Sequence, residues 1–467
     1  MYHKVLHPQV SIDRYLPLLS PQFADDLTSL AGELGHLRIV HLNSTETGGG
    51  VAEILQSMVP LMNALGVATE RVVIDPPSEF FQVTKRIHNL LQGAEGDLSK
   101  EELEVYYGSI QQVAEELRRR PVTADVWFFH DPQLLPLAGL LPRASQEVRI
   151  WIGHIDFTTP NPSVMDTLLP LVHDYDRLIF SLPTYVPAGL GDTPPFSIAP
   201  PAIDPMSAKN VAMPELAATN ITSALGIDPA RPLITQVSRF DLWKDPWGVI
   251  DAFRLARQHV PGVQLALLGL SQATDDPEAL DVLASVSNHA EQDPDIHLYF
   301  DATALPCTID DAVNAFQVTS QVLIQKSTRE GFGLTVTEAM WKAKAVIGGN
   351  VGGIRIQIED GVSGYLVSSS EECALRLVEL LRDPQLRTRL GKAAQDSVRE
   401  RFLMPRLVFD YLQVAKAHTP GKAETAGVNG STAEGAVLSD VAAVPDFVKQ
   451  KVSAEKVRVR VPRKRPT

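Results

Sequence analysis

The sequence has few cysteines, no long apolar run and no excess of basic charge. Its two cysteines, Cys307 and Cys373, cannot build a disulfide framework or a four-cysteine zinc site. No stretch approaches roughly 18 apolar residues without a charge, so we expect no membrane-spanning helix. The first twenty residues lack the basic-then-apolar pattern of a secretory signal. We therefore expect a cytoplasmic protein without a membrane partner.

Acidic residues outnumber basic ones, 56 against 42, which gives a formal net charge of −14. The segment Pro420–Thr467 is the exception, with nine basic and five acidic residues. An acidic body argues against a nucleic-acid partner, because duplex phosphates require a basic face. If the substrate is anionic, a few local cations must hold it rather than the overall field.

Apolar strand-like runs alternate with helical patterns over most of the 467 residues, which is typical of parallel sheets wrapped by helices. The alternation stops in a proline-rich segment at 194–205 and then starts again. One hydrophobic core rarely holds so long a chain. We therefore predict an α/β protein with two Rossmann-like, doubly wound domains, hinged near residues 195–215.

The tail from 420 onward is rich in Gly, Ala, Ser, Thr and Glu before it ends in a basic run. Such a composition buries little apolar surface, so we predict that the tail is flexible. Its basic end is either solvated or touches an acidic partner.

Three consecutive glycines follow the first strong strand pattern, LRIVHLN at 37–43. Gly48, Gly49 and Gly50 then lead into a helical pattern that ends near Gly66. Glycines let a backbone approach a ligand closely, and a helix start offers unpaired N–H groups to an anion. The turn either binds a phosphate or sugar or only needs a positive φ.

A basic pair follows the first strand pattern of the second half, PLITQVSRF at 232–240. Arg239 ends this strand and Lys244 precedes a helix that we expect to be capped by Asp245. In open α/β sheets ligands bind at this edge, and two cations with a helix N-terminus suit a diphosphate. The alternative pairs Arg239 with Asp241 and leaves Lys244 in solvent.

Two glutamates flank a glycine-rich turn in QKSTREGFGLTVTEAMWKAKAVIGG. Glu330 precedes Gly331 and Gly333 at a strand's carboxyl end, where a carboxylate can accept hydrogen bonds from sugar hydroxyls. Glu338 lies farther on and fits a capping box that begins at Thr335, in which it would satisfy only a backbone N–H.

These features resemble the retaining nucleotide-sugar glycosyltransferases of family 4, which have two Rossmann domains facing across a cleft (the GT-B fold). Longer segments, among them GGGVAEILQSMVPLMNALG, WIGHIDFTTPNP and PPAIDPMSAKN, are similar to the trehalose glycosyltransferring synthases within that family. The resemblance spans roughly residues 35–415. We predict four segments. Residues 1–210 form the acceptor-side domain and 211–400 the nucleotide-sugar domain. Residues 401–419 form a helix that packs back on the first domain, and 420–467 form the flexible basic tail.

The resemblance implies a role for each matching residue. Arg239 and Lys244 should bind the donor diphosphate, and Glu330 should hold the transferred glucose. Glu338 should hold the nucleotide ribose. The further residues implied to contact the donor are Gly49, Gly50, Gly331, Phe332, Gly333 and Leu334.

The first half of the chain supplies the remaining candidates. His154 matches a histidine that contacts the donor sugar in such enzymes; taken without the family, a lone histidine at a strand end is more often structural. The residues assigned to the acceptor pocket are Lys85, His88, Asn89 and Asp156.

Metal chemistry is not expected from any motif. Asp174-Tyr175-Asp176 precedes a strand, and Asp293-Pro294-Asp295 lies in a loop ahead of one, so neither D-x-D occupies the place that a metal-dependent transferase needs. The pairs His130-Asp131 and His154-x-Asp156 lack the ligand number of a stable site. We expect no tightly bound cofactor and no required divalent cation.

The implied activity is hexosyl transfer from a nucleotide-glucose donor (ADP-, UDP- or GDP-glucose) to free glucose. The product would be α,α-trehalose, and the configuration at the anomeric carbon would be retained. A trehalose phosphorylase that uses inorganic phosphate is the nearest alternative, and a catalytically silent sugar-nucleotide sensor is a distant one. The sequence is also compatible with the formation of a homo-oligomer.

Overall fold

The computed structural model describes residues 2–191, 193–270 and 279–418. The tail expected to be flexible and basic, 420–467, lies outside these residues. Both sheets described below belong to one compact unit, Met1–Thr419.

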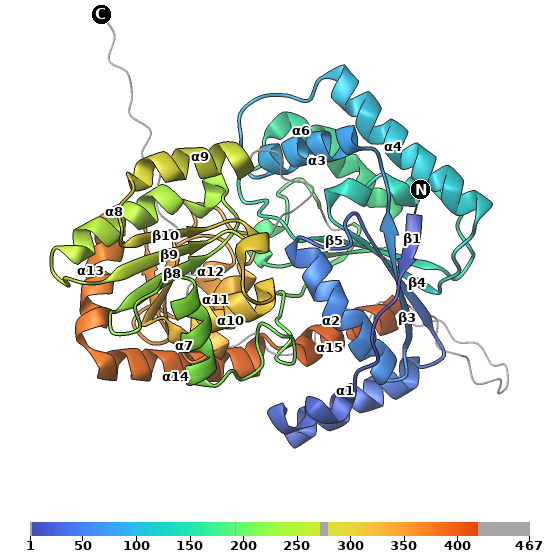
Figure 1. The fold of residues 1–467 in the computed structure, drawn as a ribbon. Coiled ribbons are helices and arrows are strands. Elements are labelled where there is room, and N and C mark those ends of the chain that lie inside the picture. The colour runs from blue at the N-terminus through green and yellow to red at the C-terminus, as the bar shows by residue number, and fades with distance from the viewer. Residues whose placement is uncertain (1, 192, 271–278, 419–467) are drawn as a thin grey trace, which may run out of the picture. The chain divides into compact units, whose positions relative to one another are not determined.

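The strands alternate with helices along the chain (Figure 1). The strands are β1 Tyr2–Val5, β2 Arg38–Asn43, β3 Ala68–Ile74, β4 Val126–His130, β5 Val148–Gly153, β6 Arg177–Phe180, β7 Phe196–Ile198, β8 Leu233–Val237, β9 Gln264–Leu268, β10 Ile296–Tyr299, β11 Val322–Gln325, β12 Ala345–Gly349 and β13 Tyr365–Val367. The α-helices are α1 Pro21–Leu34, α2 Gly50–Ala64, α3 Ser78–Leu91, α4 Lys100–Arg119, α5 Leu137–Leu140, α6 Pro162–Leu168, α7 Glu215–Ala224, α8 Pro246–Arg257, α9 Ala279–Ala290, α10 Ile309–Thr319, α11 Leu334–Trp341, α12 Ile354–Gln357, α13 Ser370–Arg382, α14 Pro384–Arg401 and α15 Met404–His418.

The first sheet has seven strands in the order β1-β3-β2-β4-β5-β6-β7. All neighbours are parallel except β1, which pairs antiparallel with β3 at the edge. The strand order reverses at β2, since β3 lies on one side of it and β4 on the other. In open α/β sheets the crevice at such a reversal is where ligands bind.

The second sheet has six parallel strands in the order β10-β9-β8-β11-β12-β13. Counted along this domain, that order is 3-2-1-4-5-6, the arrangement of the dinucleotide-binding fold. Its reversal lies between β8 and β11, the strands that precede Arg239 and Glu330. The prediction of two Rossmann-like, doubly wound sheets is therefore confirmed.

The last helix, α15, belongs to the core of the first sheet. It contacts α1 and α2, which Figure 1 shows beside it. Leu407, Val408, Tyr411 and Leu412 are buried in the apolar cluster that α1 and α2 form with strands β2, β4 and β5. The chain therefore returns from the second sheet to complete the first.

The predicted hinge near 195–215 begins too early. Residues Phe196–Ile198 form β7, which pairs with β6 as the last strand of the first sheet. The proline-rich composition hid this strand, because prolines are tolerated at a sheet edge, where one side of the backbone needs no partner strand. The segment that crosses to the second sheet follows β7.

The predicted helix ends agree with the structure at two places. Asp245 caps α8 by accepting a hydrogen bond from the Gly248 amide, and Pro246 is the first helical residue. At the end of α2, Gly66 adopts a positive φ of 87°, and its amide bonds back to the carbonyl of Asn63.

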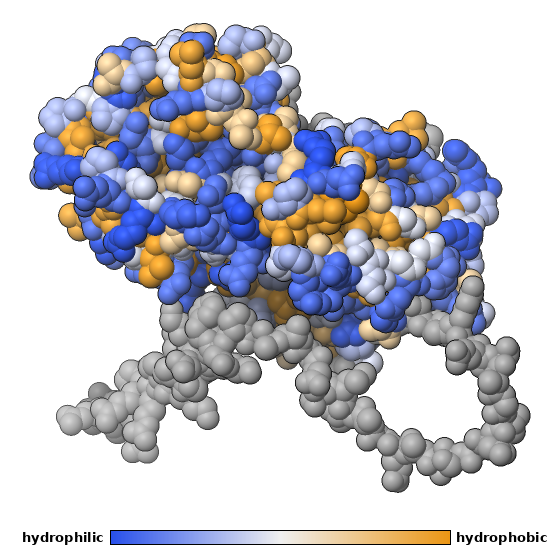
Figure 2. Space-filling model, turned by 90° about the horizontal axis from the view of Figure 1, so that it is seen from below, coloured by the Kyte–Doolittle hydropathy of each residue, from blue (hydrophilic) through white to orange (hydrophobic). Residues whose placement is uncertain are grey.

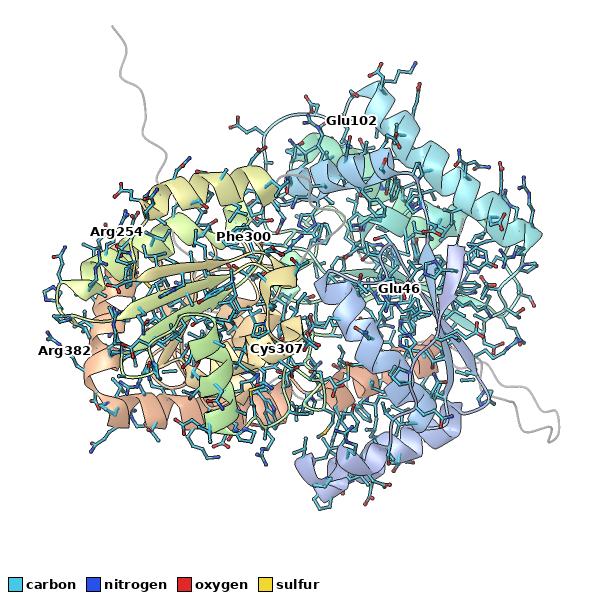
Figure 3. All side chains as sticks on the ribbon, in the orientation of Figure 1. Glu46, Glu102, Arg254, Phe300, Cys307 and Arg382 are labelled. Atoms are coloured by element: carbon cyan, nitrogen blue, oxygen red, sulfur yellow. The ribbon has the colours of Figure 1, made fainter. Side chains whose placement is uncertain are left out.

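The face shown in Figure 2 carries many hydrophilic residues, with hydrophobic patches between them. Both cysteines are free: Cys373 is buried and Cys307, labelled in Figure 3, is partly exposed. Across the ranges that the structure describes, no helix is long and apolar enough to cross a membrane.

Candidate active site

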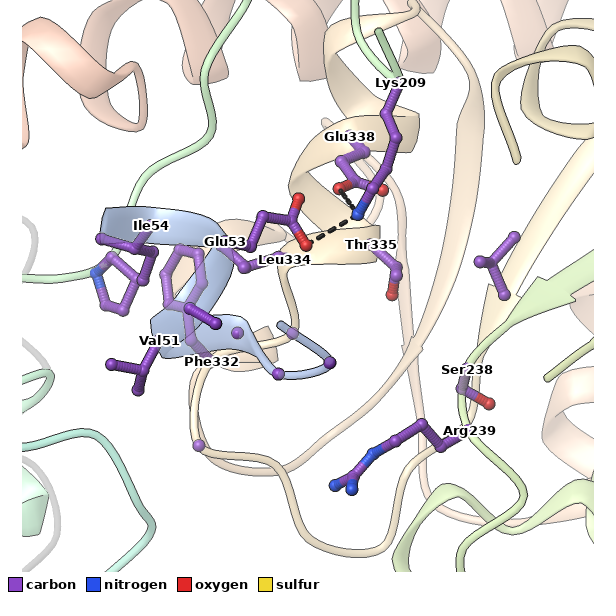
Figure 4. A pocket seen from close by; sticks show the side chains of 18 of the residues that line it. Val51, Glu53, Ile54, Lys209, Ser238, Arg239, Phe332, Leu334, Thr335 and Glu338 are labelled. Atoms are coloured by element: carbon purple, nitrogen blue, oxygen red, sulfur yellow. Dashed lines mark hydrogen bonds and ion pairs between the residues drawn. The ribbon is translucent and has the colours of Figure 1, made fainter. Parts of the chain in front are cut away.

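A cavity of about 880 Å³ is lined by residues that follow strands of both sheets. It brings together twelve of the residues predicted from the sequence, which are Gly49, Gly50, His88, His154, Arg239, Lys244, Glu330, Gly331, Phe332, Gly333, Leu334 and Glu338. Figure 4 shows Arg239 reaching into this cavity from the second sheet, with α2 of the first sheet on another side. We call this cavity the cleft.

The glycine turn forms one wall of the cleft. Gly48 has a φ of 87°, Gly49 precedes the first helical residue, and α2 begins at Gly50. A helix start carries N–H groups without intrahelical partners, so this wall can bind an anion. Gly48 has the positive φ expected of a tight turn, and Gly48 to Gly50 also line the cleft. Binding of a phosphate or sugar by this turn stays a prediction.

Arg71 on β3 holds the loop that leads into the glycine turn. Its guanidinium donates hydrogen bonds to Asn43 Oδ1 at 3.0 Å and to the carbonyls of Thr45 at 2.8 Å and Glu46 at 2.9 Å. Glu46, whose carbonyl accepts one of these hydrogen bonds, is labelled in Figure 3. The Arg71 side chain is buried, and this burial lowers its pKa to about 10. A buried guanidinium next to the turn also adds positive potential there.

The basic pair follows β8 as predicted, but its surroundings differ from the prediction. Lys244 Nζ lies 2.6 Å from Glu330 Oε2, so the alternative that left Lys244 in solvent is wrong. Asp241 pairs with Lys85 Nζ at 3.3 Å. The first residues of α8 do not line the cleft. Asp245 caps this helix start and also pairs with Lys326. The α-helix starts that line the cleft are those of α2, α10 and α11, and the first turn of α10 carries the acidic Asp310.

Glu330 is nearly buried, with 8 % of its surface exposed, between two partners. Its Oε2 accepts hydrogen bonds from Lys244 Nζ at 2.6 Å and from the Ser327 hydroxyl at 3.0 Å. A cation and a carboxylate in contact inside one cleft can bind a phosphate and a neighbouring hydroxyl group side by side.

The loop from Glu330 to Gly333 is held by contacts from both domains. The Glu330 carbonyl accepts hydrogen bonds from the Tyr185 hydroxyl at 2.7 Å and from the Gly353 amide at 3.1 Å. Gln357 Nε2 donates to the Phe332 carbonyl at 2.6 Å. A Cβ atom on Gly331 would lie 2.5 Å from the His154 carbonyl oxygen, so only glycine permits this approach.

Glu338 does not belong to a capping box. Helix α11 begins at Leu334, with Gly333 in the left-handed conformation before it, so Glu338 lies in the second turn rather than the first. The Thr335 hydroxyl bonds to Gln325 Oε1 instead. Glu338 is fully buried, and its Oε2 accepts a hydrogen bond from Gln317 Nε2 at 3.1 Å.

Lys209 joins Glu338 to Glu53 of the first domain (Figure 4). Its Nζ lies 2.6 Å from Glu53 Oε2 and 3.6 Å from Glu338 Oε1. Burial, and then the charge of Glu338, raise the pKa of Glu53 to about 7. The pKa of Glu338 is lowered despite its burial, because Lys209 and Lys342 stabilise its charged form. Of the two carboxyl groups, Glu53 is therefore the one that takes up a proton as the pH falls to about 7.

The histidines of the cleft are neutral. Burial lowers the pKa of His154 to about 4. Burial, and then the charges of Lys85 and Arg239, lower the pKa of His88 to about 3. Neutral imidazoles can donate or accept hydrogen bonds from a sugar without adding charge.

Three of the residues assigned to the acceptor do not line the cleft. Lys85 is engaged with Asp241, and Asn89 lies on the same helix, α3. Asp156 accepts hydrogen bonds from Thr158 and lies 3.8 Å from the Arg329 guanidinium. Their assignment to the acceptor stays a prediction.

No group of three or more His, Cys, Asp or Glu side chains in the described part of the chain is arranged to hold a metal ion. The first D-x-D lies among arginines, since Asp176 pairs with Arg143 and also accepts from the Arg149 amide. In the second, Asp293 pairs with Arg257 at 2.8 Å.

Several residues of the site were not predicted from the sequence. Lys209 lies in PPAIDPMSAKN, one of the segments that carry the family resemblance, and that membership was the available signal. Arg71 interrupts the apolar strand ERVVID, where a charged residue indicates a buried partner. Glu53 likewise lies in GGGVAEILQSMVPLMNALG, another segment of the resemblance. The contacts of Tyr185 and Gln357 have no local signal, because their partners are distant in sequence.

The fold and the cleft together define a glycosyltransferase with the GT-B architecture. Residues 218–397 match the family described as glycosyl transferases group 1. A solved trehalose-6-phosphate synthase, OtsA, superposes with a TM-score of 0.66 and 15 % identity, covering 81 % of this chain and 99 % of that one. A related structure from E. coli was solved with UDP-2-fluoro glucose bound and has the same TM-score.

Sequence comparison identifies the family within the glycosyltransferases. Residues 41–187 match the N-terminal domain of trehalose synthase. The chain is 42 % identical to trehalose synthase of Rubrobacter xylanophilus over 86 % of this chain and 95 % of that one. It is 39 % identical to the enzyme of Pyrococcus horikoshii with the same coverage. The chain belongs to the trehalose synthase family.

A trehalose phosphorylase of Pleurotus pulmonarius is more distant. It is 29 % identical over 79 % of this chain, and the match covers 56 % of the phosphorylase. A phosphorylase activity, the nearest alternative in the sequence analysis, therefore has weaker support from sequence similarity than the synthase activity.

We predict that Gly331→Ala lowers kcat/KM at least about tenfold. Its Cβ would collide with the His154 carbonyl and displace Glu330 from the cleft, and displacements near 1 Å cost on this scale. Steady-state kinetics measure the change. Gly108→Ala is the control, since a Cβ there meets nothing within 4 Å. Equal activity of the two variants would contradict the prediction.

We predict that Glu53→Gln changes how stability depends on pH. A carboxyl whose pKa is raised from 4.5 to about 7 on folding favours the folded state at low pH, and this contribution is lost as pH rises through about 7. The Tm of the variant relative to the wild type should therefore rise between about pH 5 and pH 8. Thermal melts measure it.

Glu79→Gln, on the exposed first turn of α3, is the matched control and should show a constant difference in Tm. A flat profile for Glu53→Gln as well would show that Glu53 has an ordinary pKa.

Proposed function

We propose that the protein transfers glucose from a nucleotide-glucose donor to free glucose and thereby forms α,α-trehalose. Membership of the trehalose synthase family supports the product. The bound UDP-2-fluoro glucose of the E. coli neighbour supports a nucleotide-sugar donor in this fold. Three further points remain predictions. The protein is located in the cytoplasm, needs no divalent cation for activity, and can form a homo-oligomer.

The observation that carries the proposal is the contact of Lys244 with Glu330 inside the cleft, at 2.6 Å. A donor that brings a diphosphate to Lys244 and a hexose hydroxyl to Glu330 satisfies both groups at once. Arg239 and the amides of Gly49 and Gly50 then share the phosphate charge. The amides of Gly331 to Leu334, at the start of α11, assist Glu330.

Glu338 is proposed to bind the ribose of the donor. Its Oε1 lies 3.6 Å from Lys209 Nζ, farther than a normal hydrogen bond. Buried carboxylate oxygens of this kind are normally satisfied. A ribose hydroxyl that donates to Oε1 would complete the group.

The reaction is proposed to retain the α configuration by displacement on one face of the sugar. Retaining glycosidases instead use a carboxylate nucleophile and a separate acid/base carboxylate. Glu330 and Glu338 are both proposed to accept hydrogen bonds from hydroxyl groups of the donor, so neither is assigned to attack on the anomeric carbon. The acceptor hydroxyl therefore attacks the anomeric carbon as the bond to the β-phosphate breaks, and its proton passes to the departing phosphate oxygen.

Catalysis on this scheme rests on positioning and on stabilisation of charge. Arg239 and Lys244 stabilise the negative charge that develops on the leaving diphosphate. His154 is proposed to contact the transferred glucose. His88, which lines the cleft as a neutral imidazole, is proposed to contact the acceptor together with Lys85, Asn89 and Asp156.

A single assay tests the proposal against its alternatives. Pure protein is incubated with glucose and either a nucleotide-glucose or glucose 1-phosphate, and trehalose and nucleoside diphosphate are followed. We expect trehalose only with the nucleotide-glucose. Trehalose from glucose 1-phosphate indicates a phosphorylase, and no product in either reaction indicates a sensor. A panel of ADP-, UDP- and GDP-glucose ranks the donors.

We predict that Arg239→Ala lowers kcat/KM roughly 30- to 1000-fold, which corresponds to about 2 to 4 kcal/mol of transition-state stabilisation. The loss arises because one preorganised cation no longer faces the leaving diphosphate. Arg389→Ala is the control, since Arg389 is exposed and lies outside the cleft. Unchanged kcat/KM in Arg239→Ala would exclude the role.

A further inference from the structure

Three histidines form a hydrogen-bonded chain from the core of the first domain to the cleft. His41 Nδ1 lies 3.0 Å from His130 Nε2, and His130 Nδ1 lies 3.0 Å from His154 Nε2. The rings of His130 and His154 stack with an interplanar angle of 6°. His41 and His130 are fully buried, whereas His154 lines the cleft.

The sheet register produces this chain. His41 on β2 pairs with Phe128 on β4, and His130 lies two residues farther along β4 on the same face. His130 in turn pairs with Ile152 on β5, and His154 lies two residues farther. Because side chains alternate between faces with a period of two, each step moves one strand across and two residues toward the carboxyl edge.

The groups around the buried end are mostly apolar. Phe128 stacks on His41 with ring centroids 4.7 Å apart, and Tyr411 of α15 lies over both rings. Arg71 on β3 is the register partner of His41. Burial, and then the Arg71 charge and the nearby His7, lower the pKa of His41 to about 3.

A chain of neutral imidazoles has only two orderings of its protons, because each N···N contact needs one donor and one acceptor. In one ordering every ring is protonated on Nε2, and His41 then buries an N–H group. In the other every ring is protonated on Nδ1, and His41 buries only a lone pair. Within the described residues His41 Nε2 has no hydrogen-bond partner.

The second ordering is favoured for two reasons. A buried N–H without an acceptor is rarer in proteins than a buried acceptor that lacks a donor. The positive charge of Arg71 beside His41 also favours a lone pair over an N–H at this end. The ordering leaves each histidine protonated on Nδ1, so the Nδ1–H of His154 is not used within the chain.

We infer that His41 and His130 are positioning residues that hold His154 as the Nδ1–H tautomer, so that it presents a hydrogen-bond donor to a sugar oxygen in the cleft. This inference rests on the proposed function for the identity of the ligand. The tautomer itself follows from the histidine chain and the surroundings of its buried end, and it does not depend on the identity of the ligand. On this assignment His154 does not act as a base, because its Nε2 lone pair accepts from His130.

Ring-nitrogen NMR of the full chain labelled with ¹⁵N-histidine tests the tautomer. Signals are assigned by their loss in the single variants His41→Asn, His130→Gln and His154→Asn. We expect protonated Nδ1 and unprotonated Nε2 for all three rings near neutral pH. Protonation of His154 on Nε2 in the wild type would overturn the inference, whether or not the protein makes trehalose.

Kinetics test the consequence. In His130→Phe we expect His154 to lose its fixed tautomer and kcat to fall about tenfold, the scale of one hydrogen bond, with KM for the donor nearly unchanged. His130→Gln should restore both, because its amide can donate to His154 and its oxygen can accept from His41. His173→Phe, an exposed histidine outside the cleft, is the control and should change nothing.

The two measurements separate the possible failures. A correctly folded His130→Phe that keeps the His154 tautomer and the wild-type kcat overturns the inference. Absence of glucosyl transfer by the wild type overturns the proposed function, while the spectra still decide the tautomer.

Discussion

The ion pair between Lys244 and Glu330 is the interaction on which the rest of the site depends. Both side chains are largely removed from water, with 18 % and 9 % of their surfaces exposed. Removing two charges from water costs on the order of several kcal/mol per ion, a cost that their attraction and the Ser327 hydrogen bond oppose and that can exceed the attraction. The pair is therefore suited to exchange its partners for those of a ligand, and the surrounding structure must keep both groups in place meanwhile.

That support comes from both domains. Tyr185, which lies between strands β6 and β7 of the first sheet, donates a hydrogen bond to the Glu330 carbonyl. Gln357 of the second domain donates one to the Phe332 carbonyl of the same loop. On the opposite wall Arg71 holds the approach to the glycine turn. Each of these side chains bonds to backbone carbonyls and so fixes the path of a loop that a ligand would contact. The cleft is thus shaped by residues that need not touch a substrate themselves.

Local patterns predicted the fold class and most of the strands, but not every element. Alternating apolar runs predicted both sheets, and the cap at Asp245 and the glycine at 66 marked helix ends correctly. The edge strand β7 was not predicted, because the prolines that flank it are typical of a linker between domains. The role of α15 could not be derived from any local pattern, since its buried face matches many partners equally well.

The site was predictable where residues follow strands. Arg239, Lys244 and Glu330 follow β8 and β11, and their convergence in one cleft follows from the parallel topology. Pairings between domains were not predictable. The bridge of Glu53, Lys209 and Glu338 joins three segments whose separation in the sequence says nothing about their distance in space. The histidine chain depends on strand register, which a sequence pattern leaves undefined.

The position of α15 has a consequence for how the protein is made. The seven strands of the first sheet are complete by Ile198, but the apolar face that carries His41 and Phe128 is covered by Tyr411 only after more than two hundred further residues have been synthesised. A nascent chain leaves the ribosome from its amino end. During synthesis the apolar face of the first sheet therefore lacks the cover of α15 until the carboxy-terminal half has been made. The packing of this core is completed only after that half is synthesised.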